Sequence, residues 1–266
     1  MSGAHGSVGS APVRHARALW LGRRPYEPIH QLQQRLVEAR AAGAVGDTVL
    51  LVEHEPVVTL GRNAAESNVL ASAESLADAG IALAHTWRGG DVTYHGPGQL
   101  VCYPILNLKP DRCDVRRYVR ALGEAMIRLA EPFGVAAGMV DGMVGVWADA
   151  EAPGCWRGAE HAARLTKIGA IGVRLVDWVS MHGFALNLCV DLSAYRWIVP
   201  CGIRQHPVGS LASLTGSAPV VAEVALGAAP VLSQALGLEL ERVEDVSNEV
   251  DFASVLGPPR VGEKPD

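Results

Sequence analysis

Residues 167–188 read KIGAIGVRLVDWVSMHGFALNL, and this stretch decides the fold class. Two apolar arms flank a polar turn at Asp177, which is the pattern of two antiparallel strands joined by a tight turn. A second pair of arms, VAAGMVDGMVGVWA at 135–148, flanks Asp141-Gly142, a dipeptide that favours hairpin turns. We therefore expect two consecutive hairpins in a largely antiparallel sheet.

Apolar spacing outside the hairpins predicts helices mixed with further strands. An aspartate, Asp114, stands where the longest helical pattern begins and is a suitable N-cap. Because the order does not follow a strict β-α-β rhythm, the sequence predicts an α+β or mixed α/β fold, in which a mixed, largely antiparallel sheet is flanked by helices. The expected helices are 26–43, a short one at 71–80, 115–133 and 222–236, and the expected strands include 16–22, 47–54, 81–87, 99–108 and 238–243.

Length and composition limit the domain organisation and the partners. With 266 residues, 49% of them hydrophobic, the chain can bury one large core. We expect a single domain at 16–240, a disordered tail at 1–15 and an acidic, proline-containing tail at 241–266. The charged, glycine-rich segment 149–166 has the composition of an inserted surface loop. A net charge of -5 argues against nucleic acid and membrane partners, and no apolar run is long enough to span a bilayer.

The cysteines bear on both location and chemistry. Five are scattered along the chain without metal-ligand spacing, so we expect a cytoplasmic protein with no metal and no other cofactor. Cys102 and Cys189 lie in apolar strands and are most simply core residues. Two cysteines are candidates for a reactive thiol. Cys113 lies just before a helix whose dipole would favour the thiolate, and Cys201 lies at the end of an extended segment.

The stretch RGGDVTYHGPGQ at 88–99 concentrates polar chemistry in an otherwise aliphatic chain. It matches neither glycine-rich phosphate motif, so a nucleotide site has no support. An ordinary turn is one interpretation; the other is a ligand-binding wall, because glycines allow close backbone approach beside Arg88 and His95. Lys167 has the same ambiguity: it is either a solvated strand end or, if it points into an apolar cleft, a candidate proton acceptor. His182 and His95 are more typical of hydrogen-bonded structural residues than of catalysts.

Four stretches, taken together and in this order, resemble the octanoyltransferases of lipoate biosynthesis. The resemblance spans residues 18–237 and includes EHEPVVTLGR at 53–62. It implies the fold of the lipoate- and biotin-protein ligases. The four stretches are RGGDVTYHGPGQL at 88–100, KIGAIGVR at 167–174, HGFALNL at 182–188 and PCGI at 200–203.

The resemblance also implies a covalent route and a set of site residues. In that family an octanoyl group passes from acyl carrier protein to a cysteine, and then to a lysine of a lipoyl domain, as in the glycine-cleavage H protein or the E2 subunits of oxo-acid dehydrogenases. Cys201 matches the acyl-accepting cysteine, and Lys167 matches the lysine that activates it. The implied acyl-binding residues are Arg88, Gly89, Gly90, Asp91, Val92, Thr93, Tyr94, His95, Ala170, Ile171, Gly172, Gly183, Phe184 and Ala185.

Three other functions stay open at this point. An amidotransferase that moves an acyl group between lipoyl domains would share the chemistry and the acceptor. An ATP-dependent lipoate ligase would need an adenylate site and no cysteine, so the PCGI stretch argues against it. A non-catalytic module that binds acyl groups or lipoyl domains would not need Cys201 and Lys167.

Overall fold

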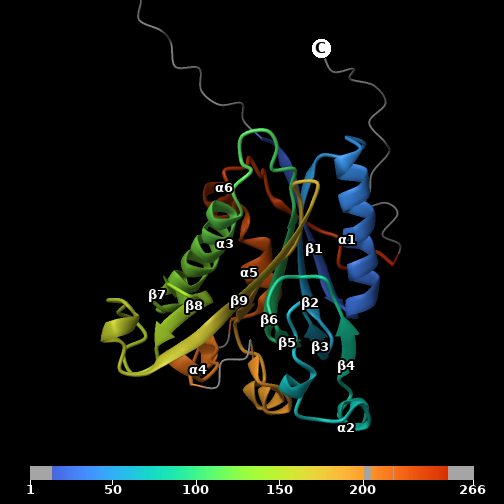
Figure 1. Ribbon diagram of the computed structural model, residues 1–266. Coiled ribbons are helices and arrows are strands. Elements are labelled where there is room, and N and C mark those ends of the chain that lie inside the picture. The colour runs from blue at the N-terminus through green and yellow to red at the C-terminus, as the bar shows by residue number, and fades with distance from the viewer. Residues whose placement is uncertain (1–13, 201–204, 218, 251–266) are drawn as a thin grey trace, which may run out of the picture.

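An eight-stranded sheet is the centre of the structure, a computed structural model that describes residues 14–200, 205–217 and 219–250. The strand order is β11-β1-β2-β6-β10-β9-β8-β7 (Figure 1). The pairs β11–β1 and β1–β2 are parallel and the others are antiparallel, which confirms the predicted fold class. The strands are β1 (Ala16–Arg24), β2 (Asp47–His54), β6 (Gln99–Ile105), β7 (Ala137–Val140), β8 (Met143–Asp149), β9 (Leu165–Val176), β10 (Val179–Asn187) and β11 (Val243–Asp245).

Both predicted hairpins are confirmed. Strands β9 and β10 pair from Val176 opposite Val179, so the turn consists of Asp177 and Trp178 alone. Both turn residues have left-handed φ values, 49° and 67°, as a two-residue turn that follows the twist of the strands requires. The β7–β8 hairpin turns at Asp141-Gly142, as its sequence predicts.

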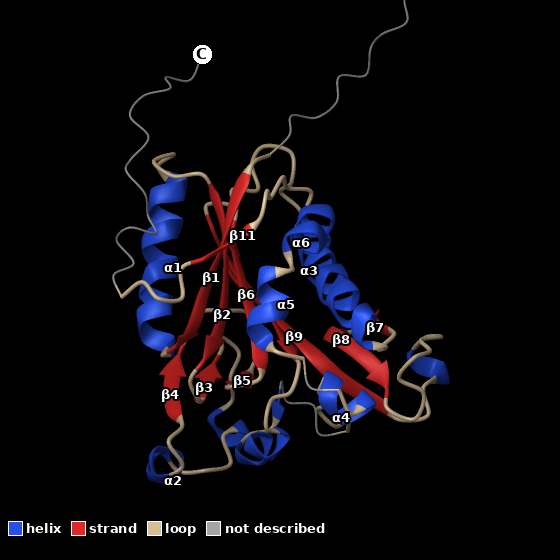
Figure 2. Ribbon diagram, turned by 180° about the vertical axis from the view of Figure 1, so that it is seen from behind, coloured by secondary structure: helices blue, strands red, loops and turns tan. Residues whose placement is uncertain are grey.

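Helices cover both faces of this sheet. Figure 2 shows α1 on one side, and α3, α5 and α6 on the other. Strand β2 serves both layers: Leu50 and Val52 join the cluster under α1, whereas Val49 and Leu51 join the cluster under the other helices. The predicted helix at 222–236 is divided at Gly227, so two helices replace one. The bounds are α1 (Tyr26–Ala41), α3 (Val115–Ala130), α4 (Leu211–Thr215), α5 (Val221–Leu226) and α6 (Ala229–Leu236).

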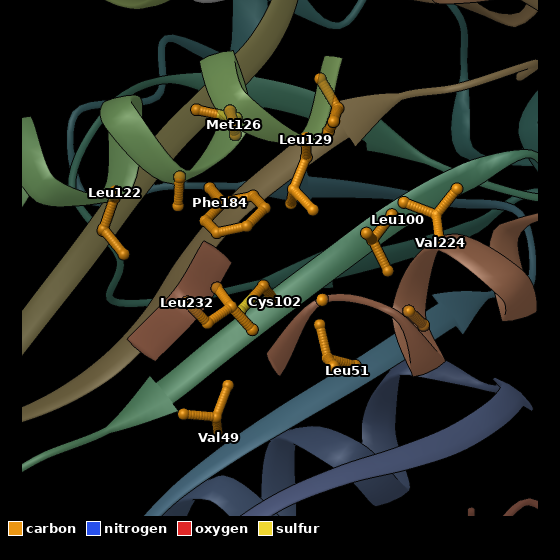
Figure 3. Close-up of a cluster of buried hydrophobic side chains, with 14 of the residues drawn as sticks. Val49, Leu51, Leu100, Cys102, Leu122, Met126, Leu129, Phe184, Val224 and Leu232 are labelled. Carbon is orange, nitrogen blue, oxygen red and sulfur yellow. The ribbon is translucent and has the colours of Figure 1, made fainter. Parts of the chain in front are cut away.

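The larger core lies between the sheet and α3 (Figure 3). Leu122 and Met126 of α3 are fully buried against Phe184 of β10, and Asp114 caps the helix by accepting a hydrogen bond from the Arg117 amide. Cys102 is buried in the same cluster, and burial raises the pKa of its thiol far above the usual range. The sequence interpretation of Cys102 as an inert core residue is therefore confirmed.

A three-stranded sheet stands at the lower end of the main sheet in Figures 1 and 2. Its order is β4-β3-β5, and β5 carries part of the glycine-rich stretch. A third apolar cluster, which includes Leu76 of α2 and Ala194 of η4, supports it. The elements are β3 (Val57–Leu60), β4 (Ala82–His85), β5 (Val92–His95), α2 (Ala73–Asp78) and the 3-10 helices η1 (Glu66–Asn68), η2 (Glu131–Phe133), η3 (Ala159–His161) and η4 (Leu192–Trp197).

The ends of the domain differ from the predicted boundaries. Within the segment 241–266, expected as a tail, Val243–Asp245 forms β11 and pairs with β1, because the side chain of Val243 is buried against the core. The strand predicted at 238–243 starts only at Val243. At the other end, His15 bridges Glu239, and residues 1–13 lie outside the described part. Within the described part, none of the helices has the length and apolar character needed to cross a membrane.

The segment 149–166, expected as an inserted loop, leaves the sheet after β8 and returns at β9. The carboxylate of Asp149 accepts hydrogen bonds from the backbone amides of Glu151, Ala163 and Arg164. These bonds join the two ends of the segment where β8 ends and β9 begins, and they lower the pKa of the Asp149 carboxyl group.

Truncation of Leu122 tests the contribution of α3 to the core. We expect Leu122→Ala to lower the free energy of unfolding by about 2–5 kcal/mol, because it removes buried methyl groups and leaves a cavity. Val115→Ala is the matched control, since Val115 is on the same helix but 42% exposed, and it should change stability by less than about 0.5 kcal/mol. Equal effects of the two substitutions in chemical denaturation would contradict this packing.

Candidate active site

Lys167 lies on β9 and is buried, with only 6% of its surface exposed. Its Nζ donates a hydrogen bond to the carbonyl oxygen of Val144 at 2.9 Å and lies 5.5 Å from the centre of the Trp147 ring. A carbonyl oxygen and an aromatic face both stabilise an ammonium group that has left water. The structure therefore excludes the solvated strand end and places the lysine in the interior.

A glycine makes room for this amine. Gly145 has a φ of 135°, and a Cβ at this position would lie 2.6 Å from Cε of Lys167 and 2.5 Å from the carbonyl oxygen of Gly169. Only glycine combines that backbone conformation with so close an approach. Gly145 was not among the predicted site residues, although a glycine inside an apolar strand is itself a signal of close approach.

A small pocket lies against Lys167. Its lining includes Pro200, the last described residue before the segment 201–204, and Val208, which bridges Lys167 through the backbone. Cys201, the predicted nucleophile, lies outside the described residues, so the position of its sulfur is not described. The full lining is Thr93, Lys167, Gly169, Ala170, Asn187, Tyr195, Pro200 and Val208.

A larger pocket adjoins the first, since Thr93 and Ala170 line both. We call it the slot. The structure brings ten of the predicted acyl-binding residues together here: Arg88, Gly90, Thr93, His95, Ala170, Ile171, Gly172, Gly183, Phe184 and Ala185. Four further lining residues were not predicted as binding residues: Tyr26, Val101, Tyr103 and His182. These come from α1, β6 and β10, whose meeting point no local sequence pattern reveals.

The other four predicted wall residues do not line the slot. Val92 and Tyr94 alternate with Thr93 and His95 along β5, so their side chains pack into the third apolar cluster instead. The Asp91 carboxylate accepts hydrogen bonds from the Ala65 amide and Asn68 Nδ2. The amide of Gly89 donates to the carbonyl oxygen of Val173 at 2.9 Å and so fastens the glycine-rich loop to β9.

Arg88 also holds this loop in place. It is buried, and its guanidinium donates to the hydroxyl and carbonyl oxygens of Thr59 on β3 and to the carbonyl oxygen of Gly89. The charge is therefore compensated by several fixed oxygen atoms. The loop and the small sheet are joined into one rigid wall of the slot.

A chain of side-chain hydrogen bonds connects the slot to the strand of Lys167. Nδ1 of His95 lies 2.6 Å from Oε1 of Gln99, Gln99 Nε2 donates to Oδ1 of Asn187, and Asn187 Nδ2 donates to the carbonyl oxygen of Gly209. The amide of Gly209 in turn donates to the carbonyl oxygen of Lys167. Because an amide oxygen only accepts, Nδ1 of His95 carries the proton and Nε2 is left as an acceptor. Burial, together with the nearby His54, lowers the pKa of His95 to about 3, so the ring is neutral.

The competing thiols lie elsewhere. Cys113 is exposed at the start of α3, where its thiol donates to the carbonyl oxygen of Leu108. Cys155 is exposed in the segment after β8 and lines a separate hollow. Neither residue lines the slot or the pocket of Lys167.

Comparisons with known proteins show the family to which the chain belongs. The model of the lipoyl protein ligase A/B catalytic domain matches residues 25–228. The octanoyltransferase of Chloroflexus aurantiacus is 43% identical over 85% of this chain and 95% of the relative, and that of Chloroflexus aggregans is 44% identical over 77% and 87%. The chain belongs to the octanoyltransferase family. A third member, from Myxococcus xanthus, is 47% identical over 77% of this chain, which spans only 55% of that relative's length.

Solved structures show the fold of this octanoyltransferase family member in lipoate ligases as well. A bipartite lipoate protein ligase from Thermoplasma acidophilum superposes with a TM-score of 0.65 and 15% identity, covering 91% of both chains. A lipoate-protein ligase A bound with ATP superposes with a TM-score of 0.61 and 14% identity, covering 92% of both chains. The predicted relation to the lipoate ligase fold is confirmed.

Three buried histidines make the stability of this octanoyltransferase family member depend on pH. Burial lowers the pKa of His54 to about 4 and of His95 and His182 to about 3. In the unfolded chain these groups have a pKa of about 6.5, so below that pH the unfolded state binds more protons and stability falls. Above that pH the contribution is complete. We expect a loss of about 1.4 kcal/mol per pH unit for each histidine as the pH falls from about 6.5 to about 4.

Urea denaturation at about pH 7.5 and about pH 5 measures this dependence. His182→Asn removes one of the titrating rings and retains a residue that tolerates a left-handed φ, so the pH slope should become smaller. A free energy of unfolding that is equal at both pH values would contradict the burial of neutral histidines.

Proposed function

We propose that the chain transfers an octanoyl group from octanoyl-acyl carrier protein to a lysine of lipoyl domains, through a thioester on Cys201. One observation carries the proposal: the buried Lys167 and Pro200, the chain neighbour of Cys201, line one pocket that adjoins the slot. Membership of the octanoyltransferase family supports the nature of the acyl group. The acceptors are the lipoyl domains of E2 subunits and the glycine-cleavage H protein.

In the first step the Cys201 thiolate attacks the carbonyl carbon of the donor thioester. A carbon–sulfur bond forms to Cys201 and the bond to the donor sulfur breaks. The carrier thiolate takes up the proton that the Cys201 thiol gave up and leaves as a thiol. A free cysteine has a pKa of about 8.5, so its thiol is mostly protonated at neutral pH and needs activation. The ammonium group of Lys167 favours the thiolate by its charge.

In the second step the acceptor lysine attacks the acyl-enzyme as a neutral amine. A carbon–nitrogen bond forms, the carbon–sulfur bond breaks, and the nitrogen loses one proton. Lys167 relays this proton to the departing cysteine sulfur, which restores the thiol. The buried amine beside Val144 and Trp147 is held in one position, as such a relay requires.

The slot holds the acyl chain. Gly172, Gly183, Ala170 and Ala185 place glycine and small side chains along β9 and β10, which leaves space for a straight chain beneath the small sheet. Each methylene removed from water contributes about 0.8 kcal/mol. This energy binds the octanoyl group and holds its carbonyl carbon at the pocket of Lys167.

The proposal places the reaction in the cytoplasm, in agreement with the free thiols of Cys102, Cys113, Cys155 and Cys189. The donor, octanoyl-acyl carrier protein, distinguishes the proposed transferase from the alternative enzymes. An amidotransferase would prefer an acylated lipoyl domain as donor, and a lipoate ligase would require ATP. Transfer from octanoyl-acyl carrier protein without ATP is the result we expect.

A mass-spectrometric assay tests the covalent step. After incubation with octanoyl-acyl carrier protein, we expect one octanoyl adduct, located on the Cys201 peptide and absent in Cys201→Ser. Cys113→Ser and Cys155→Ser are matched controls, because both thiols are exposed but outside the two pockets, and they should keep the adduct. An adduct that persists in Cys201→Ser would refute the assigned nucleophile.

A further inference from the structure

At the end away from Lys167 the slot is lined by the polar side chains of Tyr26, Tyr103 and His182, and His30 stacks on His182. Along the β9–β10 ladder, Ala185 pairs with Ala170, Gly183 with Gly172 and His182 with Val173. At about 3.3 Å per residue, His182 is therefore about 10 Å beyond Ala170, measured away from Lys167. We call the polar group at this end the cap, formed by Tyr26, His30, Gln33, Tyr103 and His182.

Three buried polar atoms of the cap have no hydrogen-bond partner in the described part of the chain. They are Nε2 of His182, Nδ1 of His30 and Nε2 of Gln33. His182 is 2% exposed and lines the slot, and His30 stacks on it with ring centres 5.6 Å apart. Burying a polar atom to this extent costs free energy unless a water molecule or a ligand forms a hydrogen bond with it.

The protonation pattern shows what these atoms offer. The side-chain amide of Gln34 donates to Nε2 of His30, so the unpartnered Nδ1 of His30 is an N–H donor. The amide nitrogen of Gln33 is also a donor, while its oxygen accepts a hydrogen bond from the backbone amide of His182. Burial lowers the pKa of His182, so the ring is neutral. The side chains of the cap are thus neutral hydrogen-bonding groups, and the charge of Arg88, which also lines the slot, is already compensated by the oxygen atoms of Thr59 and Gly89.

The backbone of His182 indicates that its ring position matters. Alternation along β10 would place the ring on the same face as Phe184, which packs under α3. Instead, a φ of 61° brings the ring to the α1 face, where it stacks on His30 and meets the edge of Tyr103. A left-handed conformation is uncommon for a residue other than glycine, although histidine adopts it more often than most, and it persists where the surroundings require it.

These observations argue against an anion or a metal at the cap. The rings are neutral, and throughout residues 14–200, 205–217 and 219–250 no three histidine, cysteine or carboxylate side chains are arranged to hold a metal ion. Water meets the requirement, because it both donates and accepts hydrogen bonds. A saturated hydrocarbon chain does neither, so its entry into the cap would leave the three atoms without partners.

We infer that the cap binds water at the end of the slot away from Lys167 and thereby limits the length of the acyl chain. His30 and His182 are then specificity-determining residues. They limit the chain length because hydrocarbon cannot form hydrogen bonds with their polar atoms, and not because they block the chain sterically. The inference rests on the proposed function, since it concerns the acyl group of the same reaction. A chain longer than eight carbons would have to displace the water from atoms that it cannot bond.

A substitution that keeps the size but removes the polarity tests this inference. His30→Leu is suitable because His30 lies on a regular turn of α1 and not at the strained position. We measure kcat/KM for acylation of the full chain by octanoyl and decanoyl thioesters of acyl carrier protein. The decanoyl to octanoyl ratio should rise about tenfold in His30→Leu, which corresponds to about 1.4 kcal/mol.

His30→Gln is the control, because it retains hydrogen-bonding groups and should leave the ratio within twofold of the wild type. If His30→Leu does not fold, Tyr26→Phe carries the test: it removes one oxygen atom from the cap and should raise the ratio about threefold. A ratio within twofold of the wild type in the folded apolar variants would overturn the inference. Failure of the wild-type chain to accept octanoyl from its carrier would instead contradict the proposed function.

Discussion

Burial of the Lys167 ammonium group is the constraint on which the active site depends. A charge of this kind remains in an interior only where fixed groups replace its water. The carbonyl oxygen of Val144 and the face of Trp147 do so, and both come from the strand next to that of Lys167. This arrangement needs a glycine at 145, because any side chain there would occupy the space of the amine. The pairing of β8 with β9 thus holds the amine of Lys167 in one position.

The slot follows from the same two strands. Small residues on β9 and β10 open one wall, and Arg88 and Gly89 fix the small sheet opposite as the second wall. The hydrogen bonds from His95 through Gln99 to Asn187 join this wall to the strand of Lys167. A fully satisfied buried network of this kind holds its members in one arrangement.

Much of this architecture could be predicted, because hydrophobic periodicity and turn-forming residues are local features of the sequence. The hairpins at Asp141 and Asp177 and the helix N-cap at Asp114 follow from such signals. Contacts between distant segments do not: β11 joins β1 from the far end of the chain, and Gln99 meets Asn187 across the sheet. The wall prediction treated residues 88–95 as continuous, whereas strand alternation removes Val92 and Tyr94 from the slot.

The most direct measurement is the single-turnover rate at which octanoyl-acyl carrier protein acylates Lys167→Met, which keeps the length of the side chain and removes its charge. We expect the rate to fall about 30-fold, because without the ammonium charge a thiol with the ordinary pKa of about 8.5 is only about 3% thiolate at pH 7. Lys109→Met is the control, because Lys109 is 46% exposed and pairs with Asp177 on the surface, and its rate should be unchanged. A folded Lys167→Met that acylates within twofold of the wild type would contradict the account.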